Sequence, residues 1–164
     1  MGQTVSFFQW IQTWFGKGTV HLPPAPTPVS TTGGTPSGVK PIDTWVCIEV
    51  MTLVNCYRRG SKLPVLAPSP ALNVMAQSWA THLASTQTLN HDGFPARLWM
   101  VVGNAAGAEN AEEGQTTPLD VVIAWLNSPL HAANLYGNYT YTGVGAAVGA
   151  DGKTYWVMDF AKLA

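Results

Sequence analysis

The stretch "GVGAAVGADGKTYWVMDF" constrains the fold most, because it predicts a β-hairpin. A two-residue turn at Asp151 and Gly152 joins its two strands, which therefore run antiparallel. Alternation along the second strand places three apolar side chains on one face, namely Trp156, Met158 and Phe160. The first strand is rich in small residues, with glycines at 143, 145 and 149. We expect another layer of structure to pack closely against it.

Three amphipathic helices precede or flank this hairpin. The first begins after Asp43 as N-cap and ends at Gly60, and the second covers about 70–87. The third begins after Thr117 as N-cap and is stopped by Pro129. The expected buried stripes are Val50, Leu53, Val54 and Tyr57 in the first helix, Leu72, Met75, Ala76, Trp79 and Leu83 in the second, and Leu119, Val122, Ile123 and Leu126 in the third.

Helices around a small sheet with sequential antiparallel strands define the fold class. We predict an α+β domain over residues 43–164, built as a three-layer α-β-α sandwich with a small, largely antiparallel sheet. A further strand is expected somewhere within 97–111. The length of 164 residues allows one domain of this size together with an appendage.

The appendage is the N-terminal part of the chain. Residues 1–18 form an aromatic docking segment, in which Phe7, Trp10, Ile11 and Trp14 recur at helical spacing. Residues 19–42 are a linker rich in Pro, Gly, Ser and Thr, and they include His21. The segment has no basic region or cleavage site typical of a signal peptide, and it is too short and too polar to span a membrane. We expect residues 1–42 to bind a protein partner or to mediate self-assembly.

The charge of the chain excludes one class of partner. The formal net charge is −1, and Arg58 and Arg59 are the only clustered basic residues, so nucleic-acid binding lacks its electrostatic basis. Hydrophobic residues make up 46% of the chain, which indicates that part of the surface meets a partner. Cys47 and Cys56 lie on opposite faces of the first helix and cannot form a disulfide with each other.

Three residues from separate segments are candidates for chemistry. His91 and His131 lie at the ends of predicted elements, and Glu109 lies among small residues in "GAENAEEG". Two neutral imidazoles and one carboxylate could hold zinc or another divalent metal with an open position, or could form an acid/base cluster. His82, inside the second helix, is expected to be a structural histidine.

The order of the segments "LNHDGF", "GAENAEEG", "WLNSPLHAANLYGNYTYTGVGAAVG" and "TYWVMDFA" resembles the CAP superfamily, also called the SCP-like domain, in its compact prokaryotic branch. The resemblance covers about residues 43–161. It implies an α-β-α sandwich with an open cleft lined by two histidines and acidic residues, which hold zinc in some members. By resemblance the histidines are His91 and His131, and the first acid is Glu109.

This sequence departs from the family pattern at three places. Ala108 replaces the glycine before the first acid. The second acid, expected near Asn127 or Ser128, is missing. The bacterial pattern Ser-Pro-Gly-His-Arg has Leu130 and Ala132 in place of its glycine and arginine. With one acid fewer, metal binding and proton transfer should both be weaker.

The resemblance and the depleted acid set together favour a binding or structural module. We expect a module of an extracellular or virion surface assembly, anchored by its N-terminal aromatic segment and carrying a His/Glu-lined cleft; its ligand would be a protein, a lipid or a component of the cell envelope. The alternative is a metal-assisted hydrolase of cell-wall or peptide bonds, with His91 and His131 as metal ligands and Glu109 as base.

Overall fold

A computed structural model describes residues 36–163. The predicted docking segment and most of the predicted linker, including His21, lie outside the described residues. The helices are α2 (Thr44–Gly60), α3 (Pro70–Thr86), α4 (Phe94–Val102), α5 (Pro118–Asn127) and α6 (Pro129–Leu135), and the strands are β1 (Lys40–Pro41), β2 (Ala67–Pro68), β3 (Ala106–Glu113), β4 (Tyr141–Val148) and β5 (Thr154–Lys162). Within residues 36–163, no helix is long and apolar enough to cross a membrane.

The strands form one small sheet in the order β1-β4-β5-β3, and the short β2 pairs with β4 as well. All pairs are antiparallel except the parallel pair of β2 and β4. Strand β3 therefore lies at an edge of the sheet. Its residue Glu109 lies directly opposite Asp159 of β5, which in turn lies opposite Gly143 of β4.

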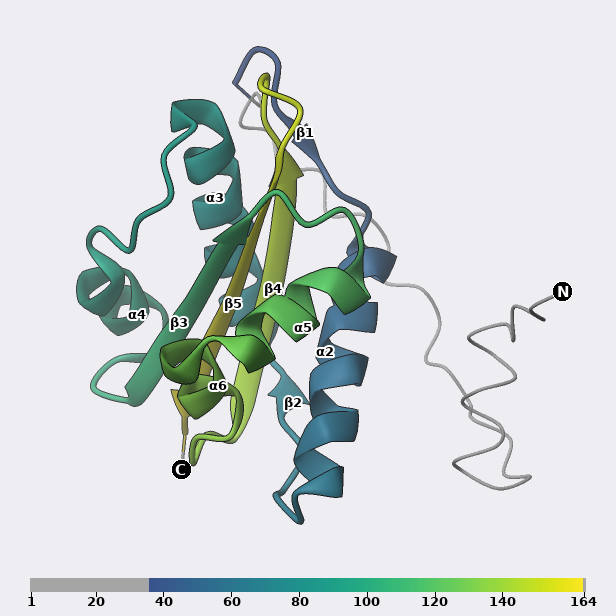
Figure 1. Cartoon of the computed structure of the whole chain (residues 1–164). Helices are drawn as coiled ribbons and strands as arrows, with labels where there is room; N and C mark the ends of the chain where they lie inside the picture. Colours follow the sequence, from purple (N-terminus) through teal and green to yellow (C-terminus); the bar gives the residue numbers. More distant parts are fainter. Residues whose placement is uncertain (1–35, 164) are drawn as a thin grey trace, which may run out of the picture. The chain divides into compact units, whose positions relative to one another are not determined.

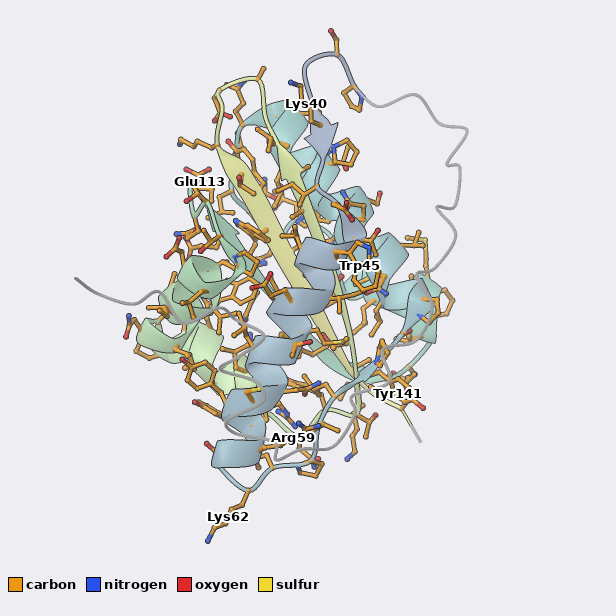
Figure 2. All side chains as sticks on the ribbon, turned by 90° about the vertical axis from the view of Figure 1, so that its right-hand side faces the viewer. Lys40, Trp45, Arg59, Lys62, Glu113 and Tyr141 are labelled. Carbon is orange, nitrogen blue, oxygen red and sulfur yellow. The ribbon has the colours of Figure 1, made fainter. Side chains whose placement is uncertain are left out.

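Helices cover both faces of the sheet (Figure 1). On one face, α2, α5 and α6 enclose a core built around Trp125, Trp156 and Phe160. On the other face, α3 packs against β4 and β5, with Tyr155 and Val157 in its core, and α4 lies beside α3. Figure 2 looks onto α2, with Trp45 near its start and Arg59 near its end. The predicted three-layer α-β-α sandwich is confirmed.

The close packing predicted for the glycine-rich strand is also present. A Cβ at Gly143 would lie 2.1 Å from the backbone of Leu72, and a Cβ at Gly145 would lie 2.3 Å from the Cα of Gln77. Both contacts are on α3. Only glycine lets β4 approach the helix backbone this closely.

The predicted helix boundaries follow from local capping and are confirmed. The side chains of Asp43, Ser69 and Thr117 each accept a hydrogen bond from the first turn of their helices. Cys47 and Cys56 both lie on α2, and both are free thiols.

The buried face predicted for α5 is confirmed in part, since Val122 is buried and Leu126 packs against the core, but its other two residues are not buried. Leu119 and Ile123 are exposed, whereas Val121, Val122 and Trp125 are fully buried. The segment "PLDVVIAWLN" has apolar residues around most of its circumference, so its pattern alone does not select the inner face. In the first helix, Tyr57 is likewise exposed.

Three other boundaries differ from prediction. Residues 40–42, placed in the linker, belong to the sheet, because Lys40 and Pro41 pair with β4 and the Ile42 N–H donates to the Ala146 carbonyl. The strand expected within 97–111 is present as β3, but most of α4 falls in the same region and was not predicted, since a short apolar run does not distinguish helix from strand. The hairpin turn contains three residues, 150–152. Gly152 supplies a φ of +77°, and the Gly149 N–H donates to the Lys153 carbonyl.

Candidate functional site

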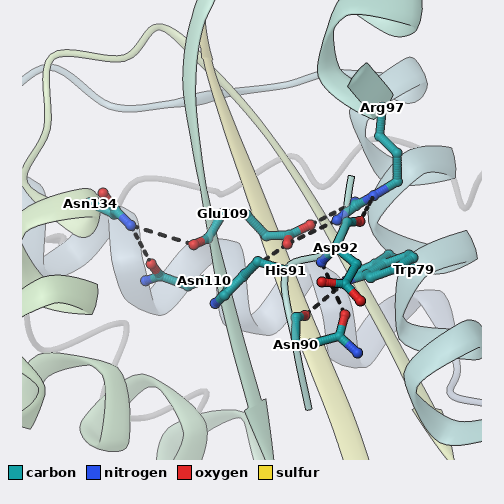
Figure 3. Close-up of polar contacts among 8 residues, drawn as sticks. All are labelled: Trp79, Asn90, His91, Asp92, Arg97, Glu109, Asn110 and Asn134. Carbon is teal, nitrogen blue, oxygen red and sulfur yellow. Dashed lines mark hydrogen bonds and ion pairs between the residues drawn. The ribbon is translucent and has the colours of Figure 1, made fainter. Parts of the chain in front are cut away.

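Glu109 forms the centre of a polar cluster at the sheet edge (Figure 3). Its carboxylate receives two hydrogen bonds from Arg97, at 2.8 Å to Oε2 and 3.1 Å to Oε1. His91 Nδ1 lies 2.8 Å from Oε1. The side chain of Glu109 is 1% exposed, against 50% for His91. Because a carboxylate only accepts hydrogen bonds, Nδ1 of His91 carries the proton in this pair.

The electrostatics of Glu109 reflect two opposed effects. Burial acts to raise its pKa, while the hydrogen bonds from His91 and Arg97 and the positive charge of Arg97 act to lower it. The net shift is downward. Glu109 is therefore an ionised, buried carboxylate whose charge is compensated by its neighbours.

Trp79 of α3 holds this cluster from one side. The Arg97 guanidinium lies 3.7 Å from the centroid of the Trp79 ring. The indole Nε1–H donates a 3.2 Å hydrogen bond to the Asn90 carbonyl, next to His91. His82 stacks on the same ring, at 4.5 Å between centroids. His82 itself is exposed on the helix surface, and its structural role stays a prediction.

His131 is held by a second, separate network. It lies on α6, where its carbonyl accepts a 3.1 Å hydrogen bond from the Asn110 side chain. Asn134 of the same helix donates to the Asn110 amide oxygen at 2.8 Å. The ring Nδ1 lies 3.9 Å from Glu112, and it has no hydrogen-bond partner within residues 36–163. The proline that stops α5 thus starts a new short helix that carries this histidine.

Burial lowers the pKa of His131. The charge of Glu112 acts in the opposite direction, and the nearby His91 acts to lower this pKa further. The net shift is downward, so the imidazole of His131 is neutral at pH 7.

The structure brings the three predicted residues to the same edge strand but not into one donor set. Successive residues of a strand point to opposite faces, and Glu109 points toward α4 while Asn110 and Glu112 point toward α6. His91 accordingly contacts Glu109 on one face of β3, and His131 lies near Glu112 on the other.

A buried carboxyl group, Asp159, lies beside Glu109 on β5. Its carboxyl oxygens have no hydrogen-bond partner among residues 36–163 other than the neighbouring carboxylate of Glu109. Burial raises its pKa well above the ordinary range, and the negative charge of Glu109 raises it further. Both effects favour the protonated, neutral form of Asp159.

The donors do not fit a zinc ion in this arrangement. Both oxygens of Glu109 are hydrogen-bonded to Arg97, and no group of three His, Cys, Asp or Glu side chains among residues 36–163 could hold a metal ion. A metal held by His91 and His131 would need both side chains and a third donor to converge. The zinc site stays a prediction.

Sequence reasoning missed four residues of the site: Trp79 as a support, Arg97, Glu112 and Asp159. Arg97 belongs to no recognisable sequence motif, although it lies six residues after His91 in a chain with few basic residues. Asp159 carried a usable signal, since it is the only charged residue in the apolar stretch "TYWVMDFA". A carboxyl in such a strand must be neutralised or paired.

An α-β-α sandwich whose edge strand lies between two histidines, one of them bound to a buried glutamate, defines the class of protein. A family model described as the cysteine-rich secretory protein family (CAP) matches residues 51–160. This is more than half of the chain, and the chain belongs to the CAP family.

Individual relatives agree with this assignment. The uncharacterized protein YkwD of Bacillus subtilis (strain 168) is 28% identical over 138 residues, which cover 80% of this chain and 51% of the relative. This chain thus spans about half the length of the curated relative that it matches.

Two solved structures share the fold. An outer surface protein from Borrelia burgdorferi has a TM-score of 0.69 at 24% identity, covering 76% of this chain and 98% of that chain. An extracellular protein containing a SCP domain from Bacillus anthracis str. Ames has a TM-score of 0.66 at 22% identity, covering 74% of this chain and 42% of that chain.

Proposed function

We propose that this chain acts outside the cell as a CAP-domain binding module, and that its polar cluster shapes the binding groove rather than catalysing a reaction. The observation that carries this proposal is that the carboxylate of Glu109 is buried and already hydrogen-bonded. Its side chain is 1% exposed, and Arg97 and His91 bind both of its oxygens. A general base or metal ligand needs a lone pair that a substrate or metal can reach.

The proposed extracellular location is supported by the relatives. The printed names of two solved structures with this fold include "outer surface protein" and "extracellular protein". We further propose that residues 1–18 anchor the module to a surface assembly, of which a virion is one kind. The support for this step is the helical spacing of Phe7, Trp10, Ile11 and Trp14.

Calorimetric titration of zinc into the full-length chain separates the binding module from the alternative metal-assisted hydrolase. We expect no saturable zinc binding, and the same result for the His91→Ala and His131→Ala variants. Stoichiometric binding in the unaltered chain, lost in both variants while their circular dichroism is unchanged, would favour the hydrolase. It would mean that Glu109 releases Arg97 to bind metal.

The anchoring step needs a separate measurement on the full-length chain. We expect sedimentation to show association that the double substitution Trp10→Ser and Trp14→Ser abolishes. Trp45→Ser, which alters an exposed tryptophan on α2, is the matched control and should leave association unchanged. A chain that is monomeric at all concentrations, with residues 1–42 mobile in NMR relaxation, would argue against anchoring by this segment.

A further inference from the structure

A pocket of about 390 Å³ lies between α4 and the start of β3. Its size is within the range of small-molecule sites. The walls come from α4, from the loop 103–105 and from Gly107, and they include two aromatic rings, Phe94 and Trp99. Trp99 is 65% exposed. An indole so exposed at a pocket mouth offers a flat face to a ligand.

The pocket carries no charge. Its lining residues are Phe94, Pro95, Leu98, Trp99, Gly103, Asn104, Ala105 and Gly107. Arg97 belongs to the same helix, but its guanidinium is bound to Glu109 and lies against Trp79. A charged ligand would lose its hydration here and find no counter-charge in the lining. The ligand that matches is uncharged.

The pocket also offers unpaired hydrogen-bonding groups. Gly103, at a φ of +66°, turns the chain out of α4, and β3 begins only at Ala106. Among the described residues, the backbone groups of Asn104 and Ala105 form no hydrogen bond with another residue, and the Asn104 side chain forms none either. A purely apolar ligand would cover these groups and leave them unsatisfied, at a cost of about 1–3 kcal/mol for each buried group.

We propose that the α4 pocket, defined by Phe94, Trp99 and the loop 103–105, binds a neutral sugar ring of an extracellular polysaccharide. A pyranose ring has one face of C–H groups that packs on the negative face of an indole, and a rim of hydroxyls that donate and accept hydrogen bonds. Trp99 takes the C–H face. Asn104 and the free backbone groups of the loop take the hydroxyls. The site is distinct from the His91 cluster and goes beyond the function proposed above.

Titration of the full-length chain with two uncharged sugars, maltotriose and N-acetylated chitotriose, tests this proposal by NMR and tryptophan fluorescence. We expect at least one sugar to shift the Trp99 indole N–H signal in a saturable manner. Trp99→Ala should raise the Kd about tenfold or more, equivalent to about 1.4 kcal/mol. Asn104→Ala should raise it severalfold. Because both residues are exposed, these variants should fold normally.

The control is Trp45→Ala, which removes an exposed tryptophan on α2 and should leave the Kd unchanged. No saturable shift of Trp99 with either sugar would overturn the proposal. Binding that survives Trp99→Ala would overturn it too, as would a pocket that takes decanoate or a proline-rich peptide but no sugar. His91→Ala should not affect sugar binding, so failure here is distinguishable from failure of the zinc experiment.

Discussion

Glu109 is the residue on which the charge balance of the site depends. It compensates Arg97, whose side chain is 16% exposed, and it fixes the proton of His91 on Nδ1. Asp159 lies directly opposite on β5, where burial and then the negative charge of Glu109 raise its pKa and favour its neutral form. The surroundings thus lower the pKa of one carboxyl, Glu109, and raise the pKa of the other, Asp159.

Glu109→Gln should lower the free energy of unfolding by about 3 kcal/mol at pH 7, because it leaves Arg97 without its carboxylate. The lowered pKa of Glu109 means that its contribution is present above the unfolded value of about 4.3 and is lost as pH falls through the folded value. Urea unfolding from pH 7 to pH 2 should show the two proteins converging in acid. Glu113→Gln, which removes the negative charge from the exposed pair with Lys153, should leave the free energy of unfolding nearly unchanged.

Asp159→Asn should raise the free energy of unfolding at high pH, whereas Glu109→Gln lowers it. The raised pKa of Asp159 means that stability is fully present below its unfolded value of about 3.9 and declines as pH rises through the folded value. Asparagine has the shape of the neutral acid and does not ionise. We expect the variant to match the unaltered chain at pH 4 and to be more stable by about 1 kcal/mol or more at pH 9. Lower stability of the variant at pH 9 would show that Asp159 is ionised and stabilised by Arg97.

At the scale of elements, the contact between α3 and β4 leaves no space for a side chain on the strand. Gly145→Ala should lower the free energy of unfolding by about 3 kcal/mol or more, because its Cβ would overlap the Gln77 backbone. Gly60→Ala, at the end of α2 with open space around it, should be neutral or stabilising by up to about 1 kcal/mol. Denaturant unfolding of both variants measures the two changes in free energy of unfolding. Equal effects would mean that the strand and helix are not in close contact.

Elements with their own capping residues could be predicted from sequence, and elements chosen by packing could not. Asp43 and Thr117 defined the starts of α2 and α5, and the alternation of Trp156, Met158 and Phe160 placed β5 correctly. The inner face of α5 depends on α2 and α6, which its own sequence does not encode. For the same reason Arg97 could not be assigned to the site, because it reaches Glu109 only once α4 packs beside β3.

At the scale of the whole molecule, Arg58 connects parts of the chain that the sequence keeps far apart. Although it carries a charge, Arg58 is only 1% exposed. Its Nε donates to the Pro64 carbonyl at 2.9 Å, and its Nη1 donates to the Leu135 carbonyl at 2.7 Å and to the Gly137 carbonyl at 3.0 Å. One guanidinium thus joins the end of α2, the loop that follows it and the end of α6.

Arg58→Lys should therefore destabilise the whole fold, because a lysine carries the charge but lacks the planar, forked donors that reach both segments at once. We expect a loss of about 2 kcal/mol, which lowers Tm by roughly 5–10 °C. Arg59→Lys, the same change at an exposed neighbour, should shift Tm by only about 1–2 °C. Calorimetry of both variants, with hydrogen exchange at residues 135–137, measures the difference. Faster exchange there in Arg58→Lys alone is expected; equal Tm values and equal exchange in the two variants would show that these three hydrogen bonds do not hold α6 to α2.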